Sequence, residues 1–204
     1  MYNNQHPQTL NYLAHIFLSN HQPQRQIGNF IGDFVKGRRF EDYPTEIRQG
    51  IVLHRHIDSY TDAHPVVKST IELMRPTFGR YSGIVLDLYF DHFLATNFNS
   101  YSPNRSLANF SIRFYASSIL HYKHLPIRVQ GFIWHFITTN RLGKYKSIEG
   151  LKNSLQIMER HKTPAISPEA AIVYLKTEYQ TLERQFHLFF PDLVNFVLAY
   201  EQKL

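Results

Sequence analysis

The segment SGIVLDLYFDHFLATNF, residues 82–98, places apolar side chains on every side of the helix that it predicts. A helix that is apolar all round is typical of a protein interior, because no face of it suits water. We therefore expect this segment to be a long buried helix at the centre of the fold, beginning near Ser82.

The rest of the chain also predicts helices, separated by short loops. Two N-terminal segments carry apolar residues at helical spacing, at Leu10, Leu13, Ile16 and Phe17, and at Ile27, Phe30, Ile31 and Phe34 with Gly37 as a possible end. Pro44 and Pro65 can each open a helix, and further helices are expected over 104–122, 126–140, 147–161 and 167–189 and after Pro191. The sequence thus predicts a single all-α domain over residues 1–204, a compact helical bundle.

The composition limits which residue types can form a metal site and where in the cell the protein is expected. The 204 residues are 43% hydrophobic and include no cysteine, so any metal must be held by His, Asp, Glu, backbone or water. The N-terminus lacks the pattern of a signal peptide, and no run of eighteen apolar residues is present. We expect a soluble cytoplasmic protein with no membrane partner.

Charge divides the chain into two unlike halves. Residues 1–100 hold nine Lys+Arg and nine Asp+Glu, whereas residues 101–204 hold thirteen and seven, which accounts for the net charge of +6. A basic half favours an acidic partner, although ordinary solubility charge explains it equally well.

Two carboxylates in the central segment demand compensation. Asp87 and Asp91 share a helix face and are surrounded by apolar residues, where an isolated carboxylate costs several kcal/mol or more. A divalent cation would compensate both; partnership with Arg55, Lys36 or a protonated histidine is the alternative. Ligand sets made of His and Asp suit Mn²⁺, Mg²⁺, Fe²⁺ or Zn²⁺.

The histidine-rich stretch LHRHIDSYTDAHP, residues 53–65, supplies further ligands. His54 and Asp58 are four residues apart on one helix face, and Asp33 interrupts another apolar helix. When His54 and Asp58 are taken alone, a structural hydrogen-bonded pair explains them better, because such pairs are common on helices. Asp87 and Asp91 in an apolar helix favour a metal site instead. Arg55 could clamp a phosphate or neutralise the aspartates. The other side chains are expected to be structural: Asp62 and His64 at a helix start, His56 at the surface, His135 in the core, and His121, His124 and His161 at the surface.

Four motifs together resemble one known family. NYLAHIFLS (Asn11–Ser19), GNFIGDFVKG (Gly28–Gly37), HRHIDSYTDAHP (His54–Pro65) and LDLYFDHFLATNF (Leu86–Phe98) resemble, in order and spacing, the acyl carrier protein phosphodiesterases. FHLFFP (Phe186–Pro191) resembles a late element of the same family. The resemblance covers nearly the whole chain, and residues 1–9 precede the point where family members usually start, as a short N-terminal extension.

The resemblance implies a fold, a reaction and a site. The family is all-α and distantly similar to HD-type metal phosphohydrolases, and it removes 4′-phosphopantetheine from holo-acyl carrier protein with Mn²⁺ as the usual metal. Its ligand positions correspond here to Asp33, His54, Asp58, Asp87, Asp91 and His92. His15 matches the histidine of the family's LAH motif; His15 or His92 could protonate the leaving oxygen, and Arg55 and Lys36 could hold the phosphate. On this assignment, Asp91→Ala abolishes activity in a protein that stays folded.

The family's substrate protein is acidic, which suits the charge of this chain. Arg38 and Arg39 lie beside Lys36 and would steer such a partner. Three alternatives are a phosphohydrolase of a nucleotide or other small phosphorylated substrate, a basic helical module that binds nucleic acid, and a family member that has lost activity. No dense basic run supports nucleic-acid binding, and none of the matched ligands is missing.

Overall fold

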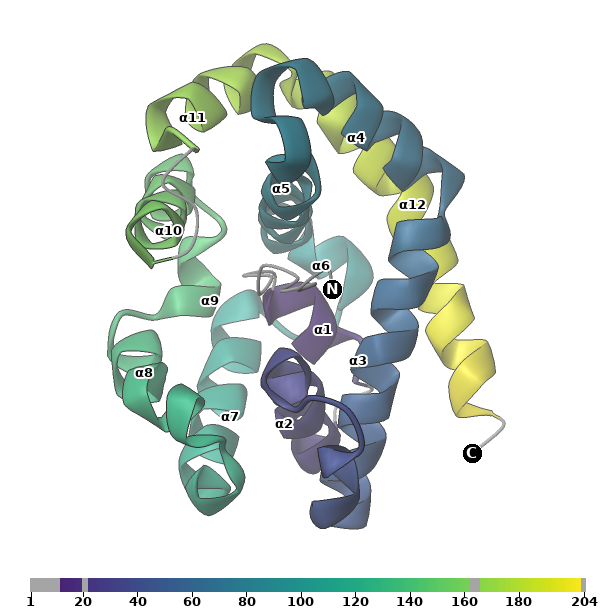
Figure 1. Cartoon of the computed structure of the whole chain (residues 1–204), viewed down its shortest axis with the longest axis vertical. Helices are drawn as coiled ribbons and strands as arrows, with labels where there is room; N and C mark the ends of the chain where they lie inside the picture. The colour runs from purple at the N-terminus through teal and green to yellow at the C-terminus, as the bar shows by residue number, and fades with distance from the viewer. Residues whose placement is uncertain (1–11, 20–21, 162–165, 203–204) are drawn as a thin grey trace, which may run out of the picture.

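The central helix is buried as its sequence predicts. In the computed structural model it is α5, Ser82–Thr96, and all its large apolar side chains are buried. Figure 1 shows α5 between α10 and α11 on one side and α4 and α12 on the other. The prediction of a long buried helix that begins near Ser82 is therefore confirmed.

The structure describes residues 12–19, 22–161 and 166–202, although not the side chains of 160 and 161. Within these ranges the chain forms helices and no strand, so the all-α prediction is confirmed. None of these helices is long and apolar enough to cross a bilayer. The predicted N-terminal extension, residues 1–9, lies outside the described ranges. The other helices are α1 Tyr12–Phe17, α2 Pro23–Ile31, η1 Gly32–Phe34, η2 Arg39–Asp42, α3 Thr45–Ala63, α4 Pro65–Phe78, η3 Gly79–Tyr81, α6 Phe98–Tyr101, α7 Leu107–Leu120, η4 Tyr122–His124, α8 Ile127–Thr138, α9 Arg141–Lys144, α10 Ile148–His161, α11 Pro168–Thr177 and α12 Tyr179–Glu201.

Two predicted boundaries are wrong. The C-terminal break falls at Glu178 between α11 and α12, and α12 continues through Pro191. Proline in a helix interior removes one backbone hydrogen bond, but Phe189, Phe190 and Leu193 are buried around it and hold the helix together. The second boundary is the end of the helix that was expected to contain Asp33. That helix, α2, ends at Ile31, and Asp33 lies in the 3-10 turn η1 that follows.

Helices α2 and α3 touch through their backbones. A Cβ atom added at Gly28 would overlap the carbonyl oxygen of Ile47, and one at Gly50 would overlap the α2 main chain. The two helices can cross this closely only because both positions are glycine. The crossing brings Asn29 of α2 against His54 of α3.

Candidate functional site

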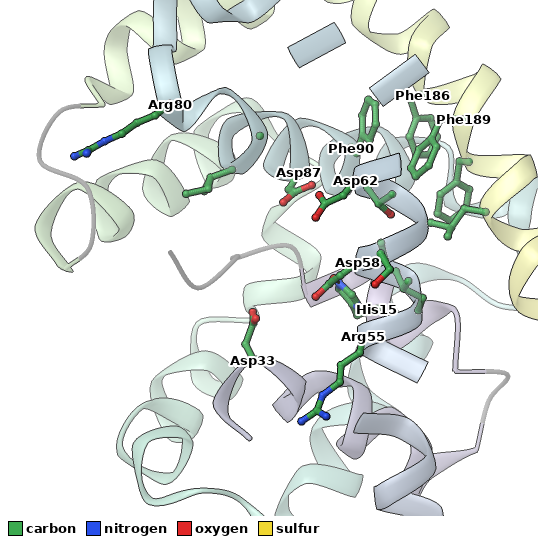
Figure 2. A pocket seen from close by; sticks show the side chains of 18 of the residues that line it. His15, Asp33, Arg55, Asp58, Asp62, Arg80, Asp87, Phe90, Phe186 and Phe189 are labelled. Carbon is green, nitrogen blue, oxygen red and sulfur yellow. The ribbon is translucent and has the colours of Figure 1, made fainter. Parts of the chain in front are cut away.

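A pocket of about 480 Å³ opens between the N-terminal helices and the pair α5–α12. Figure 2 shows polar side chains from its lower part to its centre, Arg80 at the upper left, and phenylalanines at the upper right. The polar residues that line it are His15, Asp33, Lys36, Arg55, Asp58, Asp62, Arg80 and Asp87; the large apolar residues are Ile57, Ile84, Phe90, Phe186, Phe189, Phe190 and Leu193. A pocket of this size and mixed lining is typical of a small-molecule site.

Two histidines and an aspartate meet beside the pocket: His15 and Asp58 line its wall, and His54 contacts Asp58. Asp58 Oδ1 lies 3.3 Å from His15 Nε2, and Asp58 Oδ2 lies 3.3 Å from His54 Nε2. The two imidazole rings are stacked with centroids 4.1 Å apart. The side chain of Asp33 approaches from η1, with Oδ1 3.5 Å from His54 Nε2. Two helices, α1 and α3, and the 3-10 turn η1 thus direct nitrogen and oxygen atoms toward one point.

Asn29 fixes the orientation of both rings from behind. Its carbonyl oxygen accepts a hydrogen bond from His54 Nδ1 at 2.9 Å, and its side-chain Oδ1 lies 2.9 Å from His15 Nδ1. The Asn29 Nδ2 group donates to Ser19 Oγ, and that hydroxyl donates to the His15 carbonyl oxygen. Since Nδ2 is the donor of this amide, its Oδ1 must accept, so His15 donates from Nδ1. Both histidines therefore present Nε2 to Asp58.

The site concentrates negative charge, and the pKa values respond to it. Burial lowers the pKa of His54, but the neighbouring carboxylates of Asp33 and Asp58 outweigh burial and raise it to about 9. Burial also opposes ionisation of Asp58, yet His15 and His54 hold its pKa well below the ordinary value. Desolvation and the surrounding aspartates raise the pKa of Asp87 well above its ordinary value. A cation placed among these groups would relieve their mutual repulsion.

The arrangement fits a divalent metal ion. The Nε2 atom of His54 is shielded from solvent and makes no hydrogen bond, although Asp33 and Asp58 lie close to it. One ligand atom each from His15, His54 and Asp58 lies within 4.8 Å of the other two. Histidines held through Nδ1 by amide or carbonyl oxygens are typical of metal ligands, because the outer bond fixes the tautomer. This His/Asp set is suited to Mn²⁺, Fe²⁺ or Zn²⁺.

The loop after η1 brings basic groups to the pocket. Arg55 Nη2 donates to the carbonyl oxygens of Val35 and Gly37 at 3.0 and 2.7 Å, and its guanidinium lies over the ring of Phe40. Arg55 therefore holds the loop that carries Lys36, and both side chains line the pocket. A direct role for Arg55 on a phosphate stays a prediction.

The family follows from comparison with known sequences. A sequence model described as "Acyl carrier protein phosphodiesterase" matches residues 10–193. The chain belongs to this family. The resemblance carried by the four motifs is therefore confirmed.

Named relatives support the same assignment. The acyl carrier protein phosphodiesterase of Yersinia pestis is 30% identical over 186 residues, covering 91% of this chain and 96% of the relative. The proteins of the same name from Enterobacter sp. and Klebsiella pneumoniae are 30% and 31% identical with the same coverage. No solved structure matches the chain, so similarity to HD-type phosphohydrolases stays a prediction.

Asp91 lies apart from the histidine cluster, against the family ligand set expected from the sequence. Its two carboxylate oxygens accept hydrogen bonds from the backbone N–H groups of Leu13 and Ala14 at 2.9 and 2.8 Å. Burial raises its pKa to about 7, and these two bonds oppose that rise. Asp91 thus caps the first turn of α1 and positions the helix that carries His15. This bond pattern accounts for its burial without a metal.

His92 also points elsewhere. Its Nδ1 lies 2.7 Å from the carbonyl oxygen of Tyr145, and its Nε2 lies 3.3 Å from the hydroxyl of Tyr179. The ring is buried, which lowers its pKa, and it does not line the pocket. His92 therefore joins α5 to α9 and α12 in this structure, and a metal or acid role for it stays a prediction without geometric support.

The predicted exposure of the remaining histidines is confirmed for some and wrong for others. His56 is exposed, as expected, and His64 caps α4 by accepting from the Val66 N–H. His135 was expected in the core but is exposed, because it lies on the outer face of α8. His121 and His124 are half-buried in the turn after α7, where the His121 imidazole bonds to the carbonyl oxygen of Ser117. The side chain of His161 lies outside the described part of the chain.

Several site residues were missed by the sequence reasoning. Asp62 was given only a capping role, yet it lines the pocket together with Arg80. Asn29 lies inside a motif that was quoted for the family resemblance, but nothing in its spacing reveals contacts to both histidines. Phe186 and Phe189 belong to the FHLFFP motif, which could have marked them.

Proposed function

We propose that the chain is a metal-dependent phosphodiesterase that hydrolyses holo-acyl carrier protein to apo-acyl carrier protein and 4′-phosphopantetheine. The observation that carries the proposal is the group His15, His54 and Asp58, of which His15 and Asp58 line the pocket, in a chain of this family. Water would add to phosphorus, and the bond from phosphorus to the serine oxygen of the carrier would break. A cytoplasmic location belongs to the same proposal.

Four side chains would hold the metal. His15, His54 and Asp58 supply two nitrogens and a carboxylate, and Asp33 adds a second carboxylate beside His54. Mn²⁺ is the proposed ion because the family resemblance implies it and the mixed ligand set suits it; Mg²⁺ and Fe²⁺ are the nearest competitors. The ion would neutralise charge on the phosphoryl oxygens and acidify water. Asp87 would contribute charge from the opposite wall.

The basic side chains of the pocket would bind the phosphodiester. Lys36 is exposed at the pocket on the loop that Arg55 holds in place. His15 has its Nδ1 hydrogen engaged by Asn29, so Nε2 is the atom through which it could act on a metal or on a proton.

The apolar part of the pocket would receive the arm of the substrate. Phe90, Phe186 and Phe189 face the cavity above the carboxylates. The pantetheine arm is long, thin and weakly polar, so it could lie against these rings while its phosphate reaches the cluster. The pocket of about 480 Å³ falls in the range that holds ligands of this size.

The test is incubation of chelator-stripped protein with holo-acyl carrier protein, with and without Mn²⁺, followed by intact mass. Manganese-dependent loss of the phosphopantetheine mass is the expected result. Asp58→Asn should abolish it, whereas the exposed Asp42→Asn should not. No loss from a protein shown to bind Mn²⁺ would contradict the substrate, and would favour a nucleotide or another small phosphorylated molecule.

A further inference from the structure

The segment between residues 92 and 148 contains no aspartate or glutamate. Its seven lysines and arginines are Arg105, Arg113, Lys123, Arg128, Arg141, Lys144 and Lys146. The whole chain has a net charge of +6, so this segment alone can account for the basic excess. A stretch of this length without a carboxylate has no internal charge to oppose contact with an anionic surface.

The same segment exposes large apolar side chains. Leu120 at the end of α7 is 78% exposed, and Ile127 at the start of α8 is 88% exposed. Trp134, two helical turns along α8, is 51% exposed, and Ile112 and Ile119 are exposed on α7. The solvent-facing stripes of two consecutive helices therefore combine aliphatic and aromatic residues with Arg113 and Arg128. Large apolar groups gathered on a surface usually mark an interaction site.

The turn between these helices is well anchored. Gln130 Nε2 donates to the carbonyl oxygens of Tyr122 and Leu125 at 3.3 and 2.8 Å. The rings of Tyr122 and Trp134 lie 5.9 Å apart, and Leu125 is buried beneath the turn. Hydrogen bonds and packing therefore hold the backbone that carries the exposed side chains. We call Ile119, Leu120, Tyr122, Ile127 and Trp134, with their basic neighbours Lys123 and Arg128, the α7–α8 tip.

The tip is separate from the pocket. No residue of α7 or α8 lines the cavity, and Figure 1 places the turn between these helices at the lower edge of the molecule, remote from α4 and α11. A carrier protein must present its phosphodiester to the pocket, which the tip does not border. The apolar side chains on the two sides of this turn are strongly exposed, Leu120 at 78% and Ile127 at 88%, and such side chains at a turn between helices suit insertion into a soft surface.

We propose that the α7–α8 tip binds the surface of an anionic lipid bilayer. Leu120, Ile127 and Trp134 enter the headgroup boundary, while Lys123 and Arg128 lie at the lipid phosphates. Apolar groups flanked by lysine and arginine are typical of proteins that lie on a membrane without crossing it. The sequence led us to expect no membrane partner because no segment spans a bilayer, but surface binding needs no spanning segment. The inference is independent of the proposed phosphodiesterase activity.

Trp134 provides the test, because it is the only tryptophan in the chain. The full chain is titrated with vesicles of phosphatidylglycerol and phosphatidylethanolamine, and with neutral phosphatidylcholine vesicles. With the anionic vesicles we expect a blue shift of the tryptophan emission, and quenching by lipids brominated on the acyl chain. Binding should weaken as salt is raised, because the charges of Lys123 and Arg128 become screened. An unchanged emission in anionic vesicles would overturn the proposal.

Substitutions distinguish vesicle binding through the α7–α8 tip from nonspecific adsorption through any exposed apolar residue. Leu120→Asp/Ile127→Asp should reduce sedimentation with anionic vesicles by about tenfold or more, because two carboxylates replace the inserted side chains. The matched control is Leu73→Asp/Val173→Asp, since these residues of α4 and α11 are 60% and 63% exposed. Equal binding by both double variants would refute the assignment. If Leu120→Asp/Ile127→Asp keeps full vesicle binding but raises KM for the carrier protein, the tip is a protein dock and the proposal is wrong.

Discussion

His54 donates from Nδ1 to the main-chain carbonyl oxygen of Asn29 across 2.9 Å, so backbone and not a side chain fixes this ring. The ring of His15 is fixed differently, through the side-chain oxygen of the same asparagine. One residue therefore holds two imidazoles by two different groups. Replacing the Asn29 side chain with an apolar one removes the acceptor that orients His15. The main-chain carbonyl oxygen that accepts from His54 remains.

Asn29→Leu should weaken Mn²⁺ binding by about tenfold to a hundredfold, because His15 loses the acceptor that orients it. Calorimetric titration of the metal-free protein measures the change. Asn29→Asp keeps an acceptor for His15 Nδ1, so it should restore most of the affinity. Leucine at the exposed Asn195 is the matched control. Unchanged affinity in a folded Asn29→Leu protein would refute the positioning role.

The metal-free protein should lose stability as the pH rises. The pKa of His54 is raised from 6.5 to about 9, so the folded state binds its proton more tightly than the unfolded state. The contribution to the free energy of unfolding is about 3 kcal/mol. It is fully present below pH 6.5 and is lost as the pH rises through about 9. Urea unfolding at several pH values measures it.

Two controls assign this pH dependence to the cluster. Asp58→Asn removes one of the charges that raise the pKa of His54, so the decline in stability should become smaller and end at a lower pH. Saturating Mn²⁺ should suppress it, because a metal-bound imidazole is already neutral. The same decline in the presence and absence of metal would contradict the assignment of His54 as a ligand.

Asp91→Ala should destabilise the protein, contrary to the expectation that it stays folded. The substitution leaves the N–H groups of Leu13 and Ala14 without their acceptors, at a cost of about 2–4 kcal/mol. Denaturant unfolding measures the loss, and Asp58→Ala is the comparison because Asp58 lies on the pocket wall. A fully stable Asp91→Ala protein that fails to bind Mn²⁺ would instead restore Asp91 as a ligand.

Reversing the charge of Arg38 and Arg39 should slow turnover of the carrier protein by about tenfold at low salt. Both side chains are exposed near the loop of Lys36. Hydrolysis of a small model phosphodiester should stay unchanged, and high salt should remove the difference. Lys176→Glu/Arg184→Glu is the control, since both residues are exposed on α11 and α12. Equal losses on both substrates would exclude steering.

The helices were predictable because each carries its own periodic signal, whereas the site depends on pairings that no local pattern contains. The apolar surroundings of Asp91 predict correctly that its carboxylate needs a partner, and a cation or a basic side chain was expected in that role. The partner is the start of α1, 78 positions away in the chain. His54 and Asp58 were predictable as a pair because they are one helical turn apart.

His15 and Asn29 show what the sequence reasoning lacked. His15 was associated with the site by its family motif alone, and only the packing of α1 against α2 places it beside Asp58. Asn29 acts partly through its backbone carbonyl, which every residue type possesses, so its identity explains only half of its role. The break at Glu178 was missed because Pro191 is a stronger local signal than any residue near Glu178.

The crossing of α2 and α3 on Gly28 and Gly50 has a consequence for attempts to redesign the enzyme. Gly32 adds to it, because a Cβ there would overlap the ring of His54. A library meant to alter substrate choice should leave these three positions untouched, since a Cβ atom at Gly28 or Gly50 would force α2 and α3 apart and one at Gly32 would displace the ring of His54. The phenylalanines of α12 that line the pocket should be varied one at a time, because they also belong to the buried core of that helix.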